Sequence, residues 1–183
     1  YYRIISAVFV AFLTAVYSPA VIKGQSLDSL LYLIDNDLVE DDNDKYRLLR
    51  RVITEIDDTE KKIRYCDQAV ELAGKLDILP GLPYLEKGDV YLNTGKYPSA
   101  LECFMKAASF FEKNEESANL GRAYNLIMIT YGKQGNHENE KYYNQKVIEV
   151  FEEAKDSLNL SYALANLGYL NYNLGNYDTA LVL

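Results

Sequence analysis

The chain has 183 residues, of which 49% are hydrophobic and 25% charged. This balance is typical of a protein with a hydrophobic core and excludes a disordered chain. Nineteen basic and 27 acidic side chains leave a net charge of −8. A surface of this charge repels phosphate, which argues against nucleic acid as a partner. Two cysteines are too few for a disulfide framework.

The N-terminal segment, residues 1–24, differs from the rest of the chain. The run Ile4–Ile22 contains no charged residue, Arg3 precedes it, and small residues flank Pro19 near its end. A short apolar run with a basic flank is typical of a secretory signal peptide. A membrane anchor is the alternative, because a run of this length can just span a bilayer. Both interpretations predict an exported protein, periplasmic or membrane-anchored, with the remainder outside the cytoplasm.

Residues 25–42 predict a short capping helix and an acidic linker. Leucine and isoleucine recur at helical spacing from Leu27 to Ile34, which predicts an amphipathic helix ahead of the repeats. The acidic stretch 40–44 lacks the glycine and the closing glutamate of a calcium-binding loop. We therefore interpret it as a solvated linker that caps a helix beginning near Asp44.

One pattern recurs along the rest of the chain, residues 43–183, with a period of about 40 residues. A shift of 40 brings matching tyrosine, glycine and phenylalanine residues of successive copies into register: Tyr84, Tyr91, Gly95 and Phe111 with Tyr124, Tyr131, Gly135 and Phe151. A further shift places Gly95 and Tyr97 on Gly175 and Tyr177, and a weaker copy lies 38 residues upstream. The pattern predicts four repeats, 43–80, 81–120, 121–160 and a truncated 161–183.

Each copy predicts two antiparallel helices joined by a tight turn. The first helix ends near a glycine (Gly95, Gly135 or Gly175), where a left-handed residue completes the turn without steric cost. The second helix carries small residues such as Ala100 that allow close approach, and phenylalanines such as Phe104 that fill the space beside them. The predicted fold class is therefore all-α, built from stacked helix-pair repeats.

These residues resemble the tetratricopeptide repeat, most clearly in the second and fourth copies. The matching positions of the second copy are Tyr84, Gly88, Tyr91, Gly95, Tyr97, Ala100, Phe104 and Ala107, and those of the fourth are Leu164, Leu167, Gly168, Gly175, Tyr177 and Ala180. The third copy departs from the pattern, with Met128, Glu140 and Asn144 in place of glycine, alanine and an aromatic residue. The resemblance implies a right-handed superhelix, or α-solenoid, of the long-repeat type. It also implies a non-catalytic scaffold that binds a protein or peptide segment and needs no cofactor.

In this family the first helix of each pair lines a concave groove. The groove positions carried over onto this chain are polar or aromatic: Asp89, Asn93, Arg122, Asn125, Tyr162, Asn166, Tyr169 and Asn173. Asparagine can bond both the N–H and the C=O of an extended peptide, and tyrosine adds apolar area with a polar tip. Arg122 is interpreted either as the partner of a nearby carboxylate or as a site for an acidic ligand group.

The sequence shows no catalytic or metal-binding constellation. His137 is the single histidine, and we expect it to replace a half-exposed packing tyrosine after a turn glycine. Cys66 and Cys103 fall on second helices of successive copies, where two buried thiols are expected more than a disulfide. Asn159 begins a glycosylation motif that has meaning only in a eukaryotic secretory pathway.

Two functions follow from these features. The first is an interaction module for a protein or peptide segment, and the second is an extracytoplasmic sensory input domain of a larger signalling protein, such as a kinase, a nucleotide cyclase or a transcription regulator. Because the pattern stops within the second helix of the fourth copy, we expect at least one more helix beyond Leu183. Contact with a membrane is expected only through the N-terminal segment or a downstream span.

Overall fold

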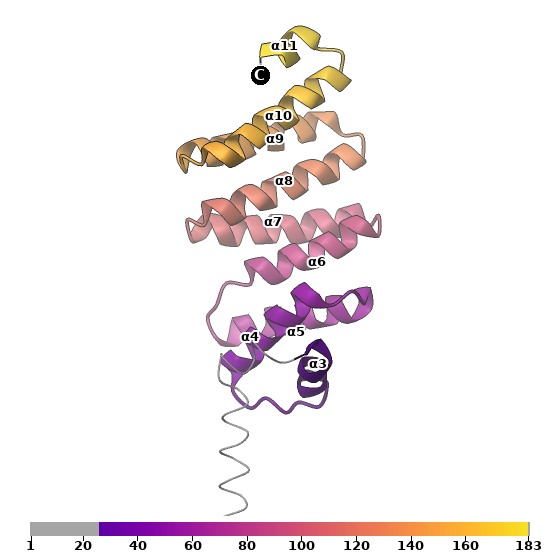
Figure 1. Cartoon of the computed structure of the whole chain (residues 1–183), viewed down its shortest axis with the longest axis vertical. Helices are drawn as coiled ribbons and strands as arrows, with labels where there is room; N and C mark the ends of the chain where they lie inside the picture. The colour runs from indigo at the N-terminus through magenta and orange to yellow at the C-terminus, as the bar shows by residue number, and fades with distance from the viewer. Residues whose placement is uncertain (1–25, 183) are drawn as a thin grey trace, which may run out of the picture. The chain divides into compact units, whose positions relative to one another are not determined.

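The computed structural model describes residues 26–182, and in that part of the chain every regular element is an α-helix (Figure 1). The chain divides into two compact units, Tyr1–Ile78 and Leu79–Leu183, called here the N-terminal and the C-terminal unit. The predicted signal peptide or anchor, residues 1–24, lies outside the described residues. No helix in the described residues is both long and apolar enough to cross a membrane.

The N-terminal unit contains helices α3 (Leu27–Asp35), α4 (Asp42–Glu55) and α5 (Thr59–Lys75). Each helix begins after a residue whose side-chain oxygen accepts a backbone N–H of the first turn, namely Ser26, Asp41 and Asp58. Such a cap satisfies one of the N–H groups that have no partner within the helix. The acidic linker therefore does cap α4, as the sequence predicts, although the helix begins two residues earlier than Asp44.

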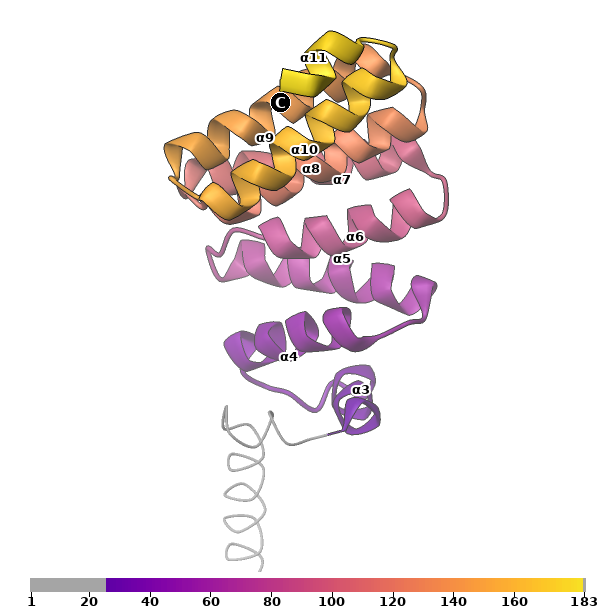
Figure 2. The same cartoon turned by 45° about the horizontal axis from the view of Figure 1, so that its top comes forward.

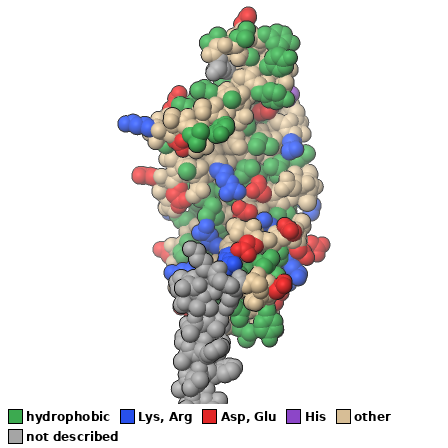
Figure 3. Space-filling model, viewed as in Figure 1, with side chains coloured by type: hydrophobic (Ala, Val, Ile, Leu, Met, Phe, Trp, Pro, Cys, Tyr) green, Lys and Arg blue, Asp and Glu red, His purple; other side chains and the backbone are tan. Residues whose placement is uncertain are grey.

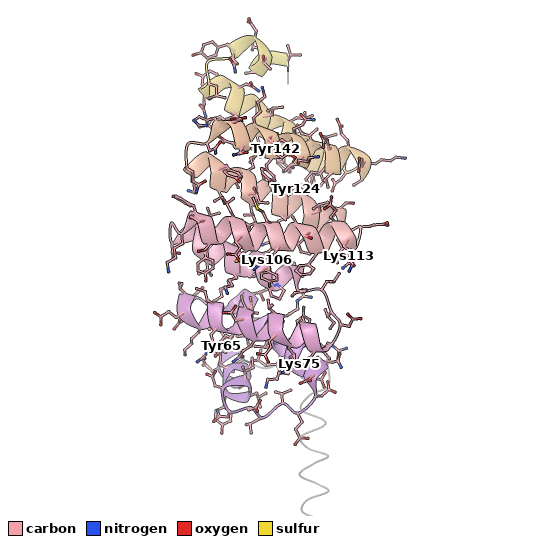
Figure 4. The ribbon with its side chains drawn as sticks, turned by 180° about the vertical axis from the view of Figure 1, so that it is seen from behind. Tyr65, Lys75, Lys106, Lys113, Tyr124 and Tyr142 are labelled. Atoms are coloured by element: carbon pink, nitrogen blue, oxygen red, sulfur yellow. The ribbon has the colours of Figure 1, made fainter. Side chains whose placement is uncertain are left out.

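Tyr65 connects α5 to α3 inside the N-terminal unit (Figure 4). Its side chain is fully buried, and its hydroxyl donates a 2.8 Å hydrogen bond to Oδ1 of Asp35. Arg64 donates to the same carboxylate at 3.0 Å. Burial, followed by the hydrogen bond to Asp35, raises the pKa of the Tyr65 phenol. The tyrosine therefore stays neutral and fixes the short α3 to the α4–α5 pair.

The C-terminal unit contains α6 (Gly81–Asn93), α7 (Tyr97–Lys113), α8 (Ser117–Lys133), α9 (His137–Glu153), α10 (Ser157–Asn173) and α11 (Tyr177–Val182). Consecutive helices of this unit pack against each other and run in alternating directions (Figures 1 and 2). Helices α7 to α10 each have 17 residues. With connections of three residues, one helix recurs every 20 residues and one pair every 40, which accounts for the long period of the sequence.

The connections between these helices share one backbone geometry. A residue with positive φ occurs in each connection: Gly95 (73°), Glu115 (57°), Gly135 (70°), Lys155 (55°) and Gly175 (79°). The next residue donates its N–H back into the preceding helix, as in the 2.8 Å bond from Lys96 to Tyr91 O. This is the Schellman arrangement, which satisfies carbonyls at the helix end. The prediction from the turn glycines is confirmed, and the structure adds two connections in which a larger residue takes the same conformation.

Replacing Lys155 by glycine is expected to stabilise the C-terminal unit by up to about 1 kcal/mol. Lys155 holds a left-handed conformation at φ 55° that glycine adopts without a Cβ clash, as Gly135 does one helix earlier. Thermal denaturation followed by circular dichroism measures the effect. The control is Gln145→Gly at an exposed position in the middle of α9, which removes a helix former and is expected to lower the melting temperature. A lower melting temperature for Lys155→Gly would contradict the argument.

Close contacts between glycine and phenylalanine hold the helix pairs together. A Cβ atom on Gly88 of α6 would lie 2.4 Å from the ring of Phe104 on α7, which is fully buried. A Cβ atom on Gly121 of α8 would lie 2.3 Å from the ring of Phe151 on α9. In both places the ring rests directly on the backbone of the facing helix, so that the helices approach closely.

The third copy packs differently, at the positions where its sequence departs from the pattern. Met128 takes the place of Gly88, and Asn144 takes the place of Phe104. Both residues are buried, and Nδ2 of Asn144 lies 3.2 Å from Sδ of Met128. The larger side chain on α8 and the smaller one on α9 keep the total volume of the pair close to that of glycine and phenylalanine, which cores tolerate well.

The cysteines are buried and the histidine is half exposed, as the sequence predicts. Cys66 on α5 and Cys103 on α7 are both buried. His137, the first residue of α9, is about half exposed, and its Nδ1 lies 2.8 Å from Oε2 of Glu140. Within residues 26–182 no group of three His, Cys, Asp or Glu side chains is placed to hold a metal ion.

Candidate functional site

A cleft of about 390 Å³ lies between α8, α9 and α10 in the C-terminal unit. Its floor is formed by Gly121, Val147, Phe151 and Ala163, all of which are buried. Around the floor lie side chains that are exposed or half-buried and mostly polar: Ala118, Arg122, Asn125, Asn159, Tyr162 and Asn166. A concave site with an apolar floor and a few polar groups is the usual form of a small binding site, and its volume falls in the usual range.

Helical spacing places these side chains around the cleft. On α8, Ala118, Arg122 and Asn125 follow one another at intervals of three or four residues and so share one face. Tyr162 and Asn166 on α10 have the same relation. Because Gly121 has no side chain, the ring of Phe151 reaches the backbone of α8 and closes the floor of the cleft between the two polar walls.

The asparagines of the two walls differ in their hydrogen bonding. The side chains of Asn125 and Asn166 make no hydrogen bond to another described residue, so their donors and acceptors face the solvent. Asn159 instead donates from Nδ2 to Oδ2 of Asp156 at 2.7 Å, and its backbone N–H donates to Oδ1. These bonds hold the pKa of Asp156 below its usual value and stop the Asn159 side chain from turning away.

Arg122 bridges two helices through ion pairs with carboxylates of α6. Its Nη2 lies 3.4 Å from Oε1 of Glu86 and 3.4 Å from Oδ2 of Asp89. The arginine side chain is 45% exposed, whereas the carboxylates are only 17% and 29% exposed. Of the two interpretations of Arg122, the structure therefore supports pairing with nearby carboxylates. Such a half-exposed pair contributes about 0–1 kcal/mol to stability, so it matters mainly for the local charge.

The eight groove positions carried over from the resemblance separate into three groups. Four of them, Arg122, Asn125, Tyr162 and Asn166, line the cleft. Asp89 lies beside it as a partner of Arg122. Asn93, Tyr169 and Asn173 are exposed residues toward the ends of α6 and α10 and do not line the cleft. The structure thus brings half of the set into one site, while binding by any of them stays a prediction.

The sequence did not predict several residues of the cleft as groove positions, namely Ala118, Gly121, Val147, Phe151, Asn159 and Ala163 in the lining and Glu86 beside it. The contact between Gly121 and Phe151 could have been detected in the sequence. Gly81 and Gly121 are 40 residues apart, each precedes a phenylalanine by 30 residues, and each touches that phenylalanine in the structure. Glu86 had no such signal, because its pairing with Arg122 depends on how α6 lies against α8.

The α10 wall of the cleft carries no Asp, Glu, Lys or Arg anywhere from Ser157 to Asn173. Hydrophobic and uncharged polar side chains cover most of the surface formed by α10 and α11 (Figure 3). Exposed aromatic residues are frequent there, including Tyr162 at 64% and Tyr169 at 69%. The α6 side of the unit, by contrast, carries Glu86 and Asp89. The two sides of the cleft thus differ in charge.

A cluster of tyrosines lies between α8 and α9, separate from the cleft (Figure 4). The ring of Tyr143 lies 5.8 Å from that of Tyr124, 5.7 Å from that of Tyr131 and 5.1 Å from that of Tyr142. Burial raises the pKa of both Tyr124 and Tyr143, which keeps their phenols neutral. The cluster therefore has the properties of a packing contact between the two helices.

Comparison with known proteins identifies the fold through solved structures. No protein-family model matches the sequence, and no curated protein matches it at a significant level. Aspartyl phosphate phosphatase F from Bacillus subtilis is similar, with a TM-score of 0.72 and 21% identity over 83% of this chain and 46% of that chain. A Rap protein in complex with competence and sporulation factor has a TM-score of 0.67 and 19% identity over 84% of this chain and 47% of that chain.

A third similar structure comes from Pyrococcus horikoshii. It is a signal transduction ATPase with numerous domains and a tetratricopeptide repeat sensor, with a TM-score of 0.71 and 18% identity over 84% of this chain and 25% of that chain. This chain spans less than half the length of each of the three structures. The likeness extends over most of the described helices and confirms the predicted all-α repeat architecture. The chain therefore has the stacked helix-pair fold of tetratricopeptide repeat proteins.

Proposed function

We propose that this chain is a non-catalytic scaffold that binds a protein or peptide segment in the cleft between α8, α9 and α10. The observation that carries the proposal is the cleft itself, with a buried apolar floor and two walls of polar side chains. Asn125 and Asn166 make no hydrogen bond within the described residues, so both amides are available to a ligand backbone. The similarity to a Rap protein in complex with competence and sporulation factor supports binding as the role of the fold.

The shape of the cleft suits an extended segment. One wall comes from α8 and the other from α10. Between them, Val147 and Phe151 of α9 form the floor together with Gly121 of α8 and Ala163 of α10. Extended backbone presents an N–H and a C=O at each residue, and an asparagine on each wall can pair with both kinds of group. Tyr162 offers apolar area beside them while keeping its hydroxyl in solvent.

Asn125→Ala is expected to weaken peptide binding by about fivefold to tenfold, because one hydrogen bond to a ligand contributes about 1 kcal/mol. The ligand for this test is a peptide selected on the full chain from a random display library, and titration calorimetry measures its affinity. Asn114→Ala is the matched control, since Asn114 is exposed at the end of α7 and outside the cleft.

Circular dichroism is expected to show unchanged folding for Asn125→Ala and Asn114→Ala, and for Asn166→Ala, which removes the asparagine of the opposite wall. If the selected peptide binds Asn125→Ala and Asn166→Ala as tightly as the unaltered chain, recognition does not occur in this cleft. A selected peptide must also be displaced from the chain by an excess of the same peptide in solution. If no selected peptide passes this competition test, the proposed function is contradicted.

We also propose that the protein is exported. The support is the uncharged run Ile4–Ile22 with Arg3 before it. If residues 1–24 act as a signal peptide, intact-mass analysis of protein from its native host is expected to show a mature chain that begins between Val21 and Gln25. Retention of the run in a membrane fraction would identify it as an anchor. Recovery of the intact chain from the cytoplasm would contradict export.

A second candidate is a sensory input region within a larger signalling protein. The observation in its favour is the similarity to a signal transduction ATPase that has a tetratricopeptide repeat sensor. The gene that encodes this chain decides the matter. A catalytic or DNA-binding domain in the same reading frame would support a sensory role, whereas a stop codon soon after the codon for Leu183 would leave the scaffold as the better description.

A further inference from the structure

The charges around the cleft restrict what kind of side chain it can hold. Among the described residues that line it, Arg122 is the one basic group, and none is an aspartate or a glutamate. The positive charge of Arg122 is already opposed by Glu86 and Asp89, each 3.4 Å away. The remaining polar lining consists of the neutral residues Asn125, Asn159, Tyr162 and Asn166.

Among the described residues that line the cleft, a charged ligand side chain would therefore find no unopposed counter-charge. A carboxylate would have to compete with two carboxylates that already hold Arg122, and a cation would meet Arg122 itself at the cleft. Moving an ionised group out of water without a partner is unfavourable, and the buried floor offers no polar side chain to compensate. The floor residues Val147, Phe151 and Ala163 are only 4%, 7% and 3% exposed.

From this geometry we infer that the cleft binds a neutral, apolar side chain of the ligand segment and discriminates against charged ones. The inference rests on the proposed function and adds the chemical class of the residue that anchors the segment. The apolar side chain contacts Val147, Phe151 and Ala163, where it leaves water at a gain that grows with its apolar area. Arg122 acts as a specificity-determining residue, because its positive charge at the cleft offsets part of the negative charge of Glu86 and Asp89.

The test uses the full chain with labelled methyl groups and three small probes, each an acetylated amino acid amide. N-acetyl-leucinamide is expected to shift the NMR signals of the Val147 and Ala163 methyl groups in a saturable way at millimolar concentration. The corresponding amides of aspartic acid and lysine, both ionised at pH 7, are expected to bind at least about tenfold more weakly. A charged probe that binds as well as the leucine probe, or no shift with any probe, would overturn the inference.

Two matched variants connect the signal to the cleft. Ala118 is an exposed residue that lines the cleft, so Ala118→Phe is expected to block it and abolish the response to the leucine probe. Ala165→Phe makes the same change at an exposed position of α10 outside the lining, and the response is expected to persist. Equal responses from both variants would show that the probe binds elsewhere and would overturn the inference.

Arg122→Ala tests the role of charge. Without the guanidinium, Glu86 and Asp89 make the edge of the cleft negative, so the lysine probe is expected to bind several-fold more tightly while the leucine probe changes little. No gain for the lysine probe would contradict the assigned role of Arg122.

The outcomes also separate the inference from the proposed function. If the selected peptide depends on Asn125 but the leucine probe shifts no methyl signal, the cleft binds peptide backbone and the apolar anchor is wrong.

Discussion

Replacing Gly88 by methionine is expected to lower the free energy of unfolding of the C-terminal unit by about 3 kcal/mol. A Cβ atom on Gly88 would lie 2.4 Å from Cε1 of Phe104, and that ring is fully buried and has no space to move into. The backbones of α6 and α7 must then separate, and the contacts on both sides of the ring are lost. Urea denaturation followed by circular dichroism measures the change.

The control for this experiment is the same substitution at Gly74 on α5. A Cβ atom there meets nothing within 4 Å, so Gly74→Met is expected to be neutral or to stabilise α5 through better helix propensity. A loss of less than about 1 kcal/mol at Gly88 would show that the helices adjust easily to added volume. The third copy shows what the fold requires instead, since Met128 at the equivalent position faces Asn144 and not a phenylalanine.

Replacing Asn144 by leucine is expected to raise the free energy of unfolding by about 1–3 kcal/mol. Asn144 is 1% exposed, its Oδ1 has no hydrogen-bond partner, and its Nδ2 reaches only the weak thioether acceptor of Met128 at 3.2 Å. Leucine has the same branched arrangement and number of side-chain heavy atoms as asparagine but no polar atom to bury, so the substitution removes the desolvation cost at the expense of slight repacking. Chemical denaturation of the full chain measures the gain.

Asn171→Leu on α10 is the matched control. Asn171 is equally buried at 2% exposed, but its Nδ2 donates to Leu167 O at 2.9 Å and its Oδ1 accepts from Asn176 at 3.5 Å. Leucine at this position removes hydrogen bonds that are made, so a loss of stability is expected. If Asn144→Leu destabilises the chain as much as Asn171→Leu does, the amide of Asn144 is satisfied in solution by a bound water molecule.

The candidate site was only partly predictable. The resemblance placed Arg122, Asn125, Tyr162 and Asn166 on the helix faces that line the cleft, because positions along a helix follow from spacing in the sequence. It also included Asn93, Tyr169 and Asn173, which lie on the same helices but outside the cleft. Helical spacing tells which residues share a face, but not where along that face a neighbouring helix leaves space.

The sequence by itself determined the helix pairs, their period of 40 residues and the glycine turns, because these features depend on residues close together in the chain. Hydrophobic spacing and left-handed turn residues act within one helix or one connection. Only the tertiary structure decided that Arg122 is paired with Glu86 and Asp89, the latter 33 residues away, and that Phe151 closes the floor of the cleft against Gly121. These contacts depend on how closely neighbouring helices approach, which is set by side-chain volumes on both helices together.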